Sequence, residues 1–415
     1  MNVLIIAQYF PPDMGGASTR VFNVAKGLVR LGCSVNVIAA FPHYPEGNIP
    51  DYYRGKALTF EKNGDIHVSR VWVPSLAHDS ISNRIILHLC FLFSSLFMLP
   101  FKGNFDVIWA ANPNLFSFIS ALIYSFVRQK PIIRNVDDLW PEVFYDMGLV
   151  KSTVLKKILD FLAWLSYTVP EAITPISAGY KGWITEKYGV SAEKIHVVEV
   201  GLKSVNPLQA EGNSNEKEEF RVMYSGVLGL GYDFDIVFDA ARLLKENEQI
   251  TFVIRGIGES VSNLQRQVKN RTLENVVLDT TFLPEDELVA LLGSADVFLL
   301  PMATMSFVDL GLPTKVFEYQ SYGKPIICVS GGEPARYVRE TMSGIVISPR
   351  DYEALAKAVL YLKENRAVAE SLGASGRRYV ESNMSIEKIG LKMMTAFGYV
   401  LRKSFEIHRT EQQAA

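Results

Sequence analysis

Residues 311–324 read GLPTKVFEYQSYGK, and the apolar run PIICVS follows directly. The segment predicts a turn, a helix that Thr314 opens as its N-cap, an end at Gly323 and then a buried strand. The free N–H groups of the first helical turn, together with the Lys315 ammonium, suit a phosphate or diphosphate. Glu318, one turn further on, could accept two hydrogen bonds from a ribose. The stretch therefore predicts half of a nucleotide-binding site, although helix capping and dipole compensation alone explain the same residues.

The composition narrows the class of protein. A chain of 415 residues is too long for one ordinary core and predicts two domains. The net charge of −2, without a long basic tract, argues against nucleic acid as a partner. Three cysteines without close pairing argue against a disulfide framework or a zinc cluster and favour a reducing compartment. The first residues, MNVLIIAQYF, predict a strand and not a signal peptide.

The first half begins with a strand over residues 2–9, the turn PPDMGGASTR and a helix over residues 18–31. Gly15 and Gly16 would let a phosphate or hydroxyl group approach the backbone at the helix N-terminus. The dinucleotide fingerprint needs three glycines at fixed spacing, so this turn is not that motif. Simple turn chemistry is the more frequent reason for two glycines at such a position. The last strand of this half is predicted at HVVEVGL, residues 196–202.

Two loops carry candidate acid–base residues. The loop over residues 41–57 is rich in Pro, Tyr and Gly, and long loops of this kind tend to overhang a site. His43 in that loop could act as an acid or base, or be a bystander. After the strand PIIRNV comes DDLWPE, which places Asp137 and Asp138 at the carboxyl end of a strand, where open α/β sheets bind ligands. Adjacent carboxylates cannot both face one point, so at most one of them is catalytic.

Two helices of the first half are more apolar than a sheet-covering helix requires. They are predicted over residues 84–101 and 115–127, and the first just reaches the length needed to span a bilayer. A span would place neighbouring strands of one sheet on opposite sides of a membrane, so we expect contact with the bilayer surface instead. Wholly internal packing is the alternative. Replacing Phe91, Leu92 and Phe97 by serine should release the protein from liposomes, or unfold it if these residues form the core.

The second half repeats the alternation of strands and helices. Residues 206–219, NPLQAEGNSNEKEE, lack an apolar period and are predicted to be a linker. Strands at FRVMYSG, ITFVIRG, NVVLDT, DVFLLP and GIVISP alternate with helices, which predicts a second parallel sheet. The predicted organisation is a first domain over 1–205, the linker, a second domain over 220–385, a helix over 386–407 that crosses back to the first domain, and a disordered tail over 408–415. The sequence DFD at 233–235 resembles a metal-binding Asp-x-Asp, but it opens a helix, which favours N-capping.

Several short motifs occur in one order along nearly the whole chain: YFPPDMGG, FPHYPEGN, DDLWPE, MYSGVLG, VIRGIGES, ADVFLLP, PTKVFEYQSYGKPII and GGE. The ordered set resembles the retaining group 1 (family 4) glycosyltransferases. PHYPEG, DLWPE and PTKVFEY are similar to the subgroup that builds surface polysaccharides and lipid-linked glycans. The resemblance implies the GT-B fold, an α/β architecture in which two Rossmann-like doubly wound parallel-sheet domains face each other across a cleft.

The resemblance also implies roles for single residues. Glu318 would bind the donor ribose, and Lys315 with the Thr314 amide would bind the donor diphosphate. The other donor-binding candidates near those phosphates are Gly15, Gly16, Gly226 and Gly229. Arg255 is also a candidate there, but it stands where many relatives have an aliphatic residue, so the resemblance does not imply its role. Asp138, Lys315 and His43 are the catalytic candidates.

The implied reaction moves a hexosyl or N-acetylhexosaminyl group, with retention, from a UDP-linked donor to a glycan on a polyprenyl diphosphate. It requires no metal and no cofactor beyond the nucleotide-diphospho-sugar substrate. The protein would be cytoplasmic and peripheral on the inner face of the plasma membrane. One departure is Leu310, which stands where many relatives carry a first glutamate. It leaves a non-catalytic sugar-nucleotide-binding subunit open, and a nucleotide-sugar epimerase is the other alternative.

Overall fold

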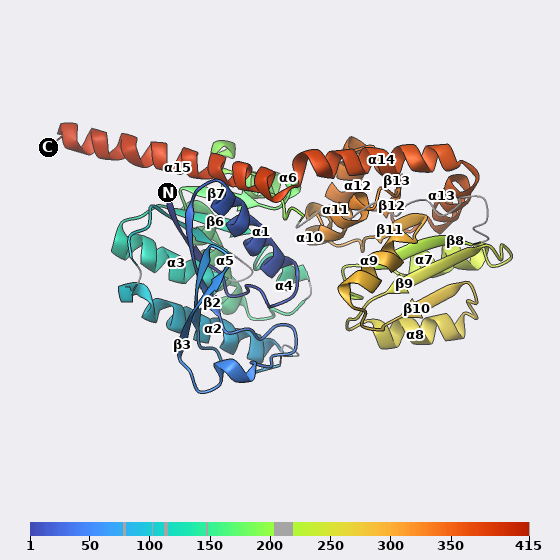
Figure 1. The fold of residues 1–415 in the computed structure, drawn as a ribbon, viewed down its shortest axis with the longest axis horizontal. Coiled ribbons are helices and arrows are strands. Elements are labelled where there is room, and N and C mark those ends of the chain that lie inside the picture. The colour runs from blue at the N-terminus through green and yellow to red at the C-terminus, as the bar shows by residue number, and fades with distance from the viewer. Residues whose placement is uncertain (78–79, 102, 112–114, 147, 203–218, 415) are drawn as a thin grey trace. The chain divides into compact units, whose positions relative to one another are not determined.

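The computed structural model describes residues 1–77, 80–101, 103–111, 115–146, 148–202 and 219–414, with side chains up to residue 403 except at 81 and 306. The predicted linker therefore lies outside the described residues except for its last residue. The chain divides into two compact units, residues 1–201 with the C-terminal helix from Ile386 onward, and residues 202–385. Each unit is built around its own sheet (Figure 1).

The first unit contains a seven-stranded sheet in the order β3-β4-β2-β1-β5-β6-β7. Every neighbouring pair is parallel except β3 with β4, so the six parallel strands have the order of a doubly wound Rossmann sheet. Its strands are β1 (Asn2–Ile6), β2 (Ser34–Ala40), β3 (Leu58–Asn63), β4 (Ile66–Val71), β5 (Val107–Ala110), β6 (Ile132–Val136) and β7 (Ala172–Pro175). Apart from the exposed Asn2, every residue of the central strands β1, β5 and β6 is buried, as expected for a sheet covered on both faces.

Helices cover both faces of this sheet: α1 (Gly16–Arg30), α2 (Ile81–Phe97), α3 (Leu115–Arg128), α4 (Glu142–Asp146), α5 (Thr153–Thr168), α6 (Ala178–Tyr188) and α15 (Ile386–Ala414). Short 3-10 turns lie at Asp51–Tyr53, Leu99–Phe101 and Ala192–Lys194. α15 packs on α1 so closely that a Cβ on Gly27 would lie 2.4 Å from the Ile386 carbonyl oxygen. α3 packs against both α2 and α5, which places these three helices in one layer.

Some sequence predictions for the first unit were wrong. HVVEVGL is not a strand. Ile195, the residue before it, forms an isolated bridge with Ile173, and the segment then runs beside β7 with single bonds such as His196 N–H to the Ile173 carbonyl, 2.9 Å, and ends on an isolated bridge at Leu202. α15 continues as a helix to Ala414, well past residue 407. Phe91 and Leu92 are buried in the core, whereas Phe97 is exposed. Their joint replacement by serine would therefore damage the core and does not test membrane contact.

The second unit contains a six-stranded, fully parallel sheet in the order β10-β9-β8-β11-β12-β13, again the Rossmann order. Its strands are β8 (Phe220–Ser225), β9 (Ile250–Arg255), β10 (Val276–Asp279), β11 (Val297–Pro301), β12 (Ile326–Val329) and β13 (Gly344–Ile347). Its helices are α7 (Asp235–Leu243), α8 (Val261–Asn270), α9 (Glu285–Gly293), α10 (Ser306–Leu310), α11 (Thr314–Ser321), α12 (Glu333–Glu340), α13 (Tyr352–Glu364) and α14 (Arg366–Asn383). The prediction had omitted α8, α10 and α12.

The predicted capping role of the DFD segment is confirmed. Asp233 Oδ1 accepts hydrogen bonds from the backbone N–H groups of Asp235 at 3.1 Å and Ile236 at 3.4 Å, at the start of α7. Within the described residues no group of three His, Cys, Asp or Glu side chains lies close enough to hold a metal ion. The order of the strands reverses between β1 and β5 in one sheet and between β8 and β11 in the other, which marks the carboxyl ends of these strands as ligand sites.

Candidate functional site

The carboxyl ends of β8 and β11 meet the amino end of α11, and Lys315 lies there. Its Nζ donates a hydrogen bond to the Tyr232 hydroxyl at 3.0 Å and lies 4.6 Å from the centroid of that ring. The Lys315 side chain passes directly over Gly226, where a Cβ would be 1.9 Å from Lys315 Cε. Gly226 also has a φ of 146°, which other residues rarely adopt. A glycine is therefore required at residue 226 for the lysine to reach this position.

Two loops extend the pairing of β8 and β9 beyond the strands. The Gly226 N–H donates to the Arg255 carbonyl at 2.9 Å, and the Leu228 N–H donates to the Ile257 carbonyl at 2.8 Å. A Cβ on Gly256 would lie 1.7 Å from the Gly226 carbonyl oxygen, so the loops can approach only because residue 256 is glycine. Gly229, another predicted donor-binding residue, lies in the first loop but has room for a Cβ.

Arg255 is buried beneath these loops and already has protein partners. Its Nε lies 3.1 Å from Asp279 Oδ2, and its Nη2 donates to the Thr281 carbonyl at 2.5 Å. Its predicted contact with donor phosphates would therefore compete with the ion pair to Asp279.

Glu318 lies one helical turn beyond Lys315 and is half-buried. In the part of the chain that the structure describes, no group hydrogen-bonds its carboxylate, although the Ser321 hydroxyl donates to its main-chain carbonyl. Burial raises the pKa of Glu318, and the nearby Lys315 ammonium opposes that rise. The site thus offers a cation and a free acceptor about one turn apart, which suits a diphosphate next to a diol.

The predicted cap of α11 was wrong in detail. Pro313 is the N-cap and no side chain caps the helix, so Thr314 is its first helical residue and can contribute only its backbone N–H. Sequence reasoning also missed Tyr319, whose hydroxyl accepts from the Ser225 N–H and donates to the Ser225 carbonyl, both at 3.0 Å. This pair of bonds fixes α11 to the end of β8.

Leu310 ends α10, and burial raises the pKa of the adjacent Asp309.

In the first unit, Asp13 connects the Gly-Gly turn to the Pro-rich loop. Its Oδ1 accepts the backbone N–H groups of His43 and Tyr44, each at 2.8 Å. Burial raises the pKa of Asp13 to about 6 against these hydrogen bonds. Gly15 is the N-cap of α1 with a φ of 108°, and a Cβ there would lie 3.3 Å from the Tyr44 ring. Gly16 begins the helix, two residues before the predicted start.

His43, near the start of the loop over residues 41–57, is buried. Its Nδ1 lies 2.7 Å from the Phe41 carbonyl oxygen and its Nε2 lies 3.4 Å from the Gln8 side-chain nitrogen. The other end of the Gln8 amide lies 2.7 Å from His88 Nδ1. Burial lowers the pKa of His43 to about 4, so the imidazole is neutral at pH 7.

The two aspartates after β6 differ in their surroundings. Asp137 Oδ1 lies 3.0 Å from Arg20 Nη1 and accepts a hydrogen bond from the Asn135 side chain at 3.0 Å. Arg20 is completely buried on α1 and donates through Nη2 to the Thr174 carbonyl at 3.0 Å. Asp138 is exposed, and no described residue hydrogen-bonds it. Desolvation by the surrounding protein and the neighbouring Asp137 charge raise the pKa of Asp138 to about 6. Of the pair, only Asp138 is available to a ligand.

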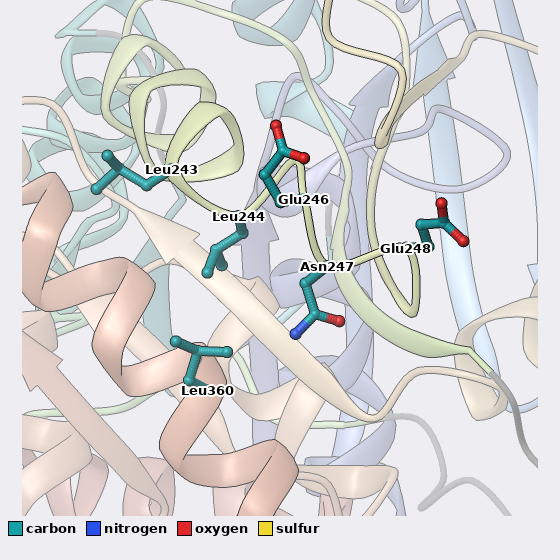
Figure 2. Close-up of a pocket in the computed structure, with 6 residues that line it drawn as sticks. All are labelled: Leu243, Leu244, Glu246, Asn247, Glu248 and Leu360. Atoms are coloured by element: carbon teal, nitrogen blue, oxygen red, sulfur yellow. The ribbon is translucent and has the colours of Figure 1, made fainter.

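A surface hollow elsewhere in the second unit is not this site (Figure 2). Its lining residues are Leu243, Leu244, Glu246, Asn247, Glu248 and Leu360. They lie at the end of α7, before β9 begins, and on α13. This is the amino edge of the sheet, whereas doubly wound sheets bind ligands at the carboxyl edge.

Among the described residues, one stretch, Ser82–Phe101, is long and apolar enough to cross a membrane by length and composition. It comprises α2 and the following 3-10 turn. Leu87 and Phe91 are completely buried in the core of the first unit, whereas Phe93 and Phe97 are exposed. The strands that the stretch connects, β4 and β5, belong to one sheet.

Comparison with known proteins agrees with this architecture. Residues 14–203 match the model of the family "Glycosyltransferase Family 4", and residues 206–379 match that of "Glycosyl transferases group 1". The amylovoran biosynthesis glycosyltransferase AmsK of Erwinia amylovora is 25% identical over 411 residues, which cover 93% of this chain and 96% of that protein. The O-antigen chain mannosyltransferase C of Escherichia coli is 23% identical, with 92% and 94% covered.

Solved structures share the fold. The sucrose-phosphate synthase of Thermosynechococcus elongatus is 15% identical with a TM-score of 0.76, covering 98% of this chain and 100% of its own. Anabaena HepE, solved in complex with UDP, is 15% identical with a TM-score of 0.65, covering 96% and 100%. Two adjoining family matches that together extend from residue 14 to residue 379, and two Rossmann-ordered sheets, lead to one assignment. The chain belongs to the group 1, family 4 glycosyltransferases and has their GT-B fold.

Proposed function

We propose that this glycosyltransferase moves a hexosyl or N-acetylhexosaminyl group, with retention, from a UDP-linked sugar to a polyprenyl-diphosphate-linked glycan during polysaccharide synthesis. The observation that carries the proposal is the pairing of Lys315, which lies over Gly226, with the carboxylate of Glu318 one turn away, which no described residue hydrogen-bonds. The names of the relatives support a polysaccharide product, since they include amylovoran and O-antigen enzymes.

The chemistry needs stabilisation of a departing diphosphate more than it needs a strong base. The Lys315 ammonium supplies a fixed positive charge, and the free N–H groups at the start of α11 supply fixed dipoles. Both stabilise the negative charge that develops on the departing diphosphate. Retention would follow from attack on the face that the diphosphate leaves, with a phosphate oxygen taking the acceptor proton. Asp138 would contact the transferred sugar, whereas His43 is buried with both ring nitrogens already close to protein groups and is not expected to touch it. This scheme requires no metal and no added cofactor.

A nucleotide screen by thermal shift tests the donor assignment. UDP should raise the melting temperature of the wild type more than GDP or ADP does, and Glu318→Ala should reduce the shift. A larger shift with GDP would overturn the choice of base. GDP has to be compared directly with UDP, because some relatives are named as GDP-mannose-dependent mannosyltransferases. The absence of a shift with any nucleotide would overturn the donor site itself.

We also propose that the protein works at the inner face of the plasma membrane, on the cytoplasmic side. Support comes from α2 and α3, where the exposed fractions of Phe93, Phe97 and Phe126 are 68%, 66% and 84%. Phe93→Ser/Phe97→Ser should reduce flotation with liposomes, whereas retained flotation would contradict the role of α2. Phe91 and Leu92 stay unchanged in this variant because both are buried in the core.

One observation keeps a second candidate function open. Leu310 at the end of α10 provides no carboxylate, which a non-catalytic sugar-nucleotide-binding subunit would tolerate. Incubation with UDP-sugars and bacterial membranes separates the possibilities. Sugar incorporated into lipid supports the transferase, whereas nucleotide binding without turnover supports the subunit. An isomerised donor would instead indicate an epimerase.

A further inference from the structure

Helix α5 is apolar on the side that faces away from the protein. Its packed side consists of Ala163, Ser166 and Tyr167, which are all buried. On the wheel of an α-helix, at 100° per residue, the opposite side contains Val154, Ile158 and Phe161. The exposed fractions of the large apolar side chains on the helix are 69% for Val154, 45% for Leu155, 52% for Ile158, 60% for Phe161 and 49% for Trp164. An ordinary surface helix exposes polar and charged side chains on its outer side, whereas the outer side of α5 is apolar.

The outward side chains are not needed to hold α5 in place. The inner side is fixed by Tyr167, whose ring lies 4.4 Å from the Arg134 guanidinium and stacks on Tyr188 at 4.5 Å. The amino-terminal half is held by Tyr145 of α4, whose hydroxyl donates to Asp160 at 2.8 Å. Because an exposed apolar row of this extent is rare on a monomer without a partner, it indicates a binding surface.

The charges beside this row favour one kind of partner. Lys151 and Lys157 are exposed next to it and have no ion-pair partner among the described residues. The first turn of α5 contains no acidic residue, although an acidic side chain there would favour the helix dipole. The acidic residue of this half, Asp160, is already bonded to Tyr145. A row of apolar side chains with lysines at its edge is typical of helices that lie on anionic bilayers.

We propose that the outward side of α5 binds the surface of a bilayer with anionic headgroups. Val154, Ile158, Phe161 and Trp164 would enter the interface, and Lys151 and Lys157 would contact lipid phosphates. α5 packs beside α3, and α3 beside α2, so the three helices form one layer on a face of the first sheet (Figure 1). The inference rests on the membrane association proposed above and assigns a further helix to it.

The test uses the full chain and sucrose-loaded vesicles of phosphatidylglycerol and phosphatidylethanolamine, with pure phosphatidylcholine for comparison. We expect Ile158→Ser/Phe161→Ser to lower the partition coefficient at least about tenfold, because two large apolar groups leave the interface. Lys151→Glu/Lys157→Glu should lower it about tenfold or more on anionic vesicles only. Brominated lipids should quench Trp164, so the loss of fluorescence should be smaller in Trp164→Phe.

Two variants serve as matched controls. Lys156→Glu reverses one lysine charge on the other side of α5, half the charge change of the double lysine variant, at a place where the ammonium lies 5.0 Å from the Tyr145 ring centroid. Phe282→Ser removes an 84% exposed phenylalanine from the second unit. Both variants should partition onto vesicles like the wild type. Equal partition of the wild type and the α5 variants would overturn the proposal.

Other outcomes are also decisive. A concentration-dependent dimer that Phe161→Ser abolishes, without vesicle binding, would assign the surface to a second copy of the chain and overturn the proposal. If Ile158→Ser/Phe161→Ser lowers the melting temperature, the lysine variant decides, because both of its side chains are exposed. A UDP thermal shift measured without vesicles reports on the donor site alone, so failure of the transferase assignment and failure of the α5 assignment remain distinguishable.

Discussion

The carboxyl edges of the two sheets have the same strand order but differ in how their ionisable side chains are used. In the first unit Asp13, His43 and Asp137 are each bonded to other groups of the protein. In the second unit Glu318 has no bonded partner within the described residues, and the Lys315 ammonium donates a hydrogen bond to the Tyr232 hydroxyl. The same topology thus supports one edge that is rigid and one that can receive a ligand. Substitutions should cost stability at the first edge and ligand affinity or rate at the second.

The largest effect should come from Arg20→Ala at the rigid edge. The substitution leaves Asp137 buried without its cation, and breaking a buried pair in this way typically costs about 3–5 kcal/mol of the free energy of unfolding. Chemical denaturation of the variant measures the loss.

A double-mutant cycle sharpens this test. Asp137→Asn in the Arg20→Met background should recover part of the stability, because no unpaired charge then remains. Full stability in Arg20→Ala would contradict the view that this edge is held by the ion pair.

At the receptive edge, Lys315→Ala should lower kcat about a hundredfold, since a fixed charge at a developing anion contributes on that scale. Its melting temperature should stay close to that of the wild type, because among the described residues the ammonium hydrogen-bonds only Tyr232. An equal loss in kcat and in donor affinity would instead indicate simple anchoring of the donor.

Glu318→Ala should weaken donor binding about tenfold, because hydrogen bonds to a charged group contribute roughly 1.5–3 kcal/mol. Calorimetric titration with UDP measures the change, and Glu318→Gln separates charge from shape. Unchanged affinity in both variants would exclude the ribose role. A large drop in melting temperature would show that this carboxylate belongs to the fold and not to a ligand site.

The difference between the two sheet edges also explains which features of the fold and the site could be predicted from the sequence. Strong apolar runs predicted β1 and β6 of the first sheet and all six strands of the second, and the motif at residues 311–324 located Lys315 and Glu318 on one short helix, α11. HVVEVGL was misassigned because alternating apolar residues do not show whether a segment forms a continuous hydrogen-bonded ladder with a neighbouring strand. The prediction of Thr314 as cap failed because Pro313 already fits the extended conformation that precedes a helix.

Residues of the rigid edge could not be found in this way. Arg20 lies within α1 and Asp137 follows β6, and their pairing depends on a separation of more than a hundred residues. Arg20 stands out only as a charged residue within the apolar period of α1, and that signal is weak. Tyr232 and Tyr319 were missed for the same reason, since aromatic residues near strand ends usually belong to the core.

Asp138 is the exception at the first edge, because it is exposed and unpaired. With its pKa raised to about 6, it is ionised at pH 7 and becomes protonated as the pH falls through about 6. If the carboxylate contacts the transferred sugar, kcat/KM of the wild type should fall over that range. Asp138→Asn should lower kcat/KM about fivefold at pH 7, the scale of one ordinary hydrogen bond, and should lose the acidic limb. An acidic limb that persists in the variant would assign it to another group, with Glu318 and Asp13 as candidates.

The smallest effect should come from Tyr232→Phe, which keeps the ring beneath Lys315 and removes the hydroxyl at 3.0 Å. The ammonium would remain over Gly226 through its contact with the ring, but with more freedom, so kcat should fall about threefold while KM changes little. Tyr232→Ala removes both contacts and should lower kcat further. If Tyr232→Phe binds UDP more tightly, the hydroxyl competes with the diphosphate for Lys315, and the receptive edge is then partly held closed before the donor arrives.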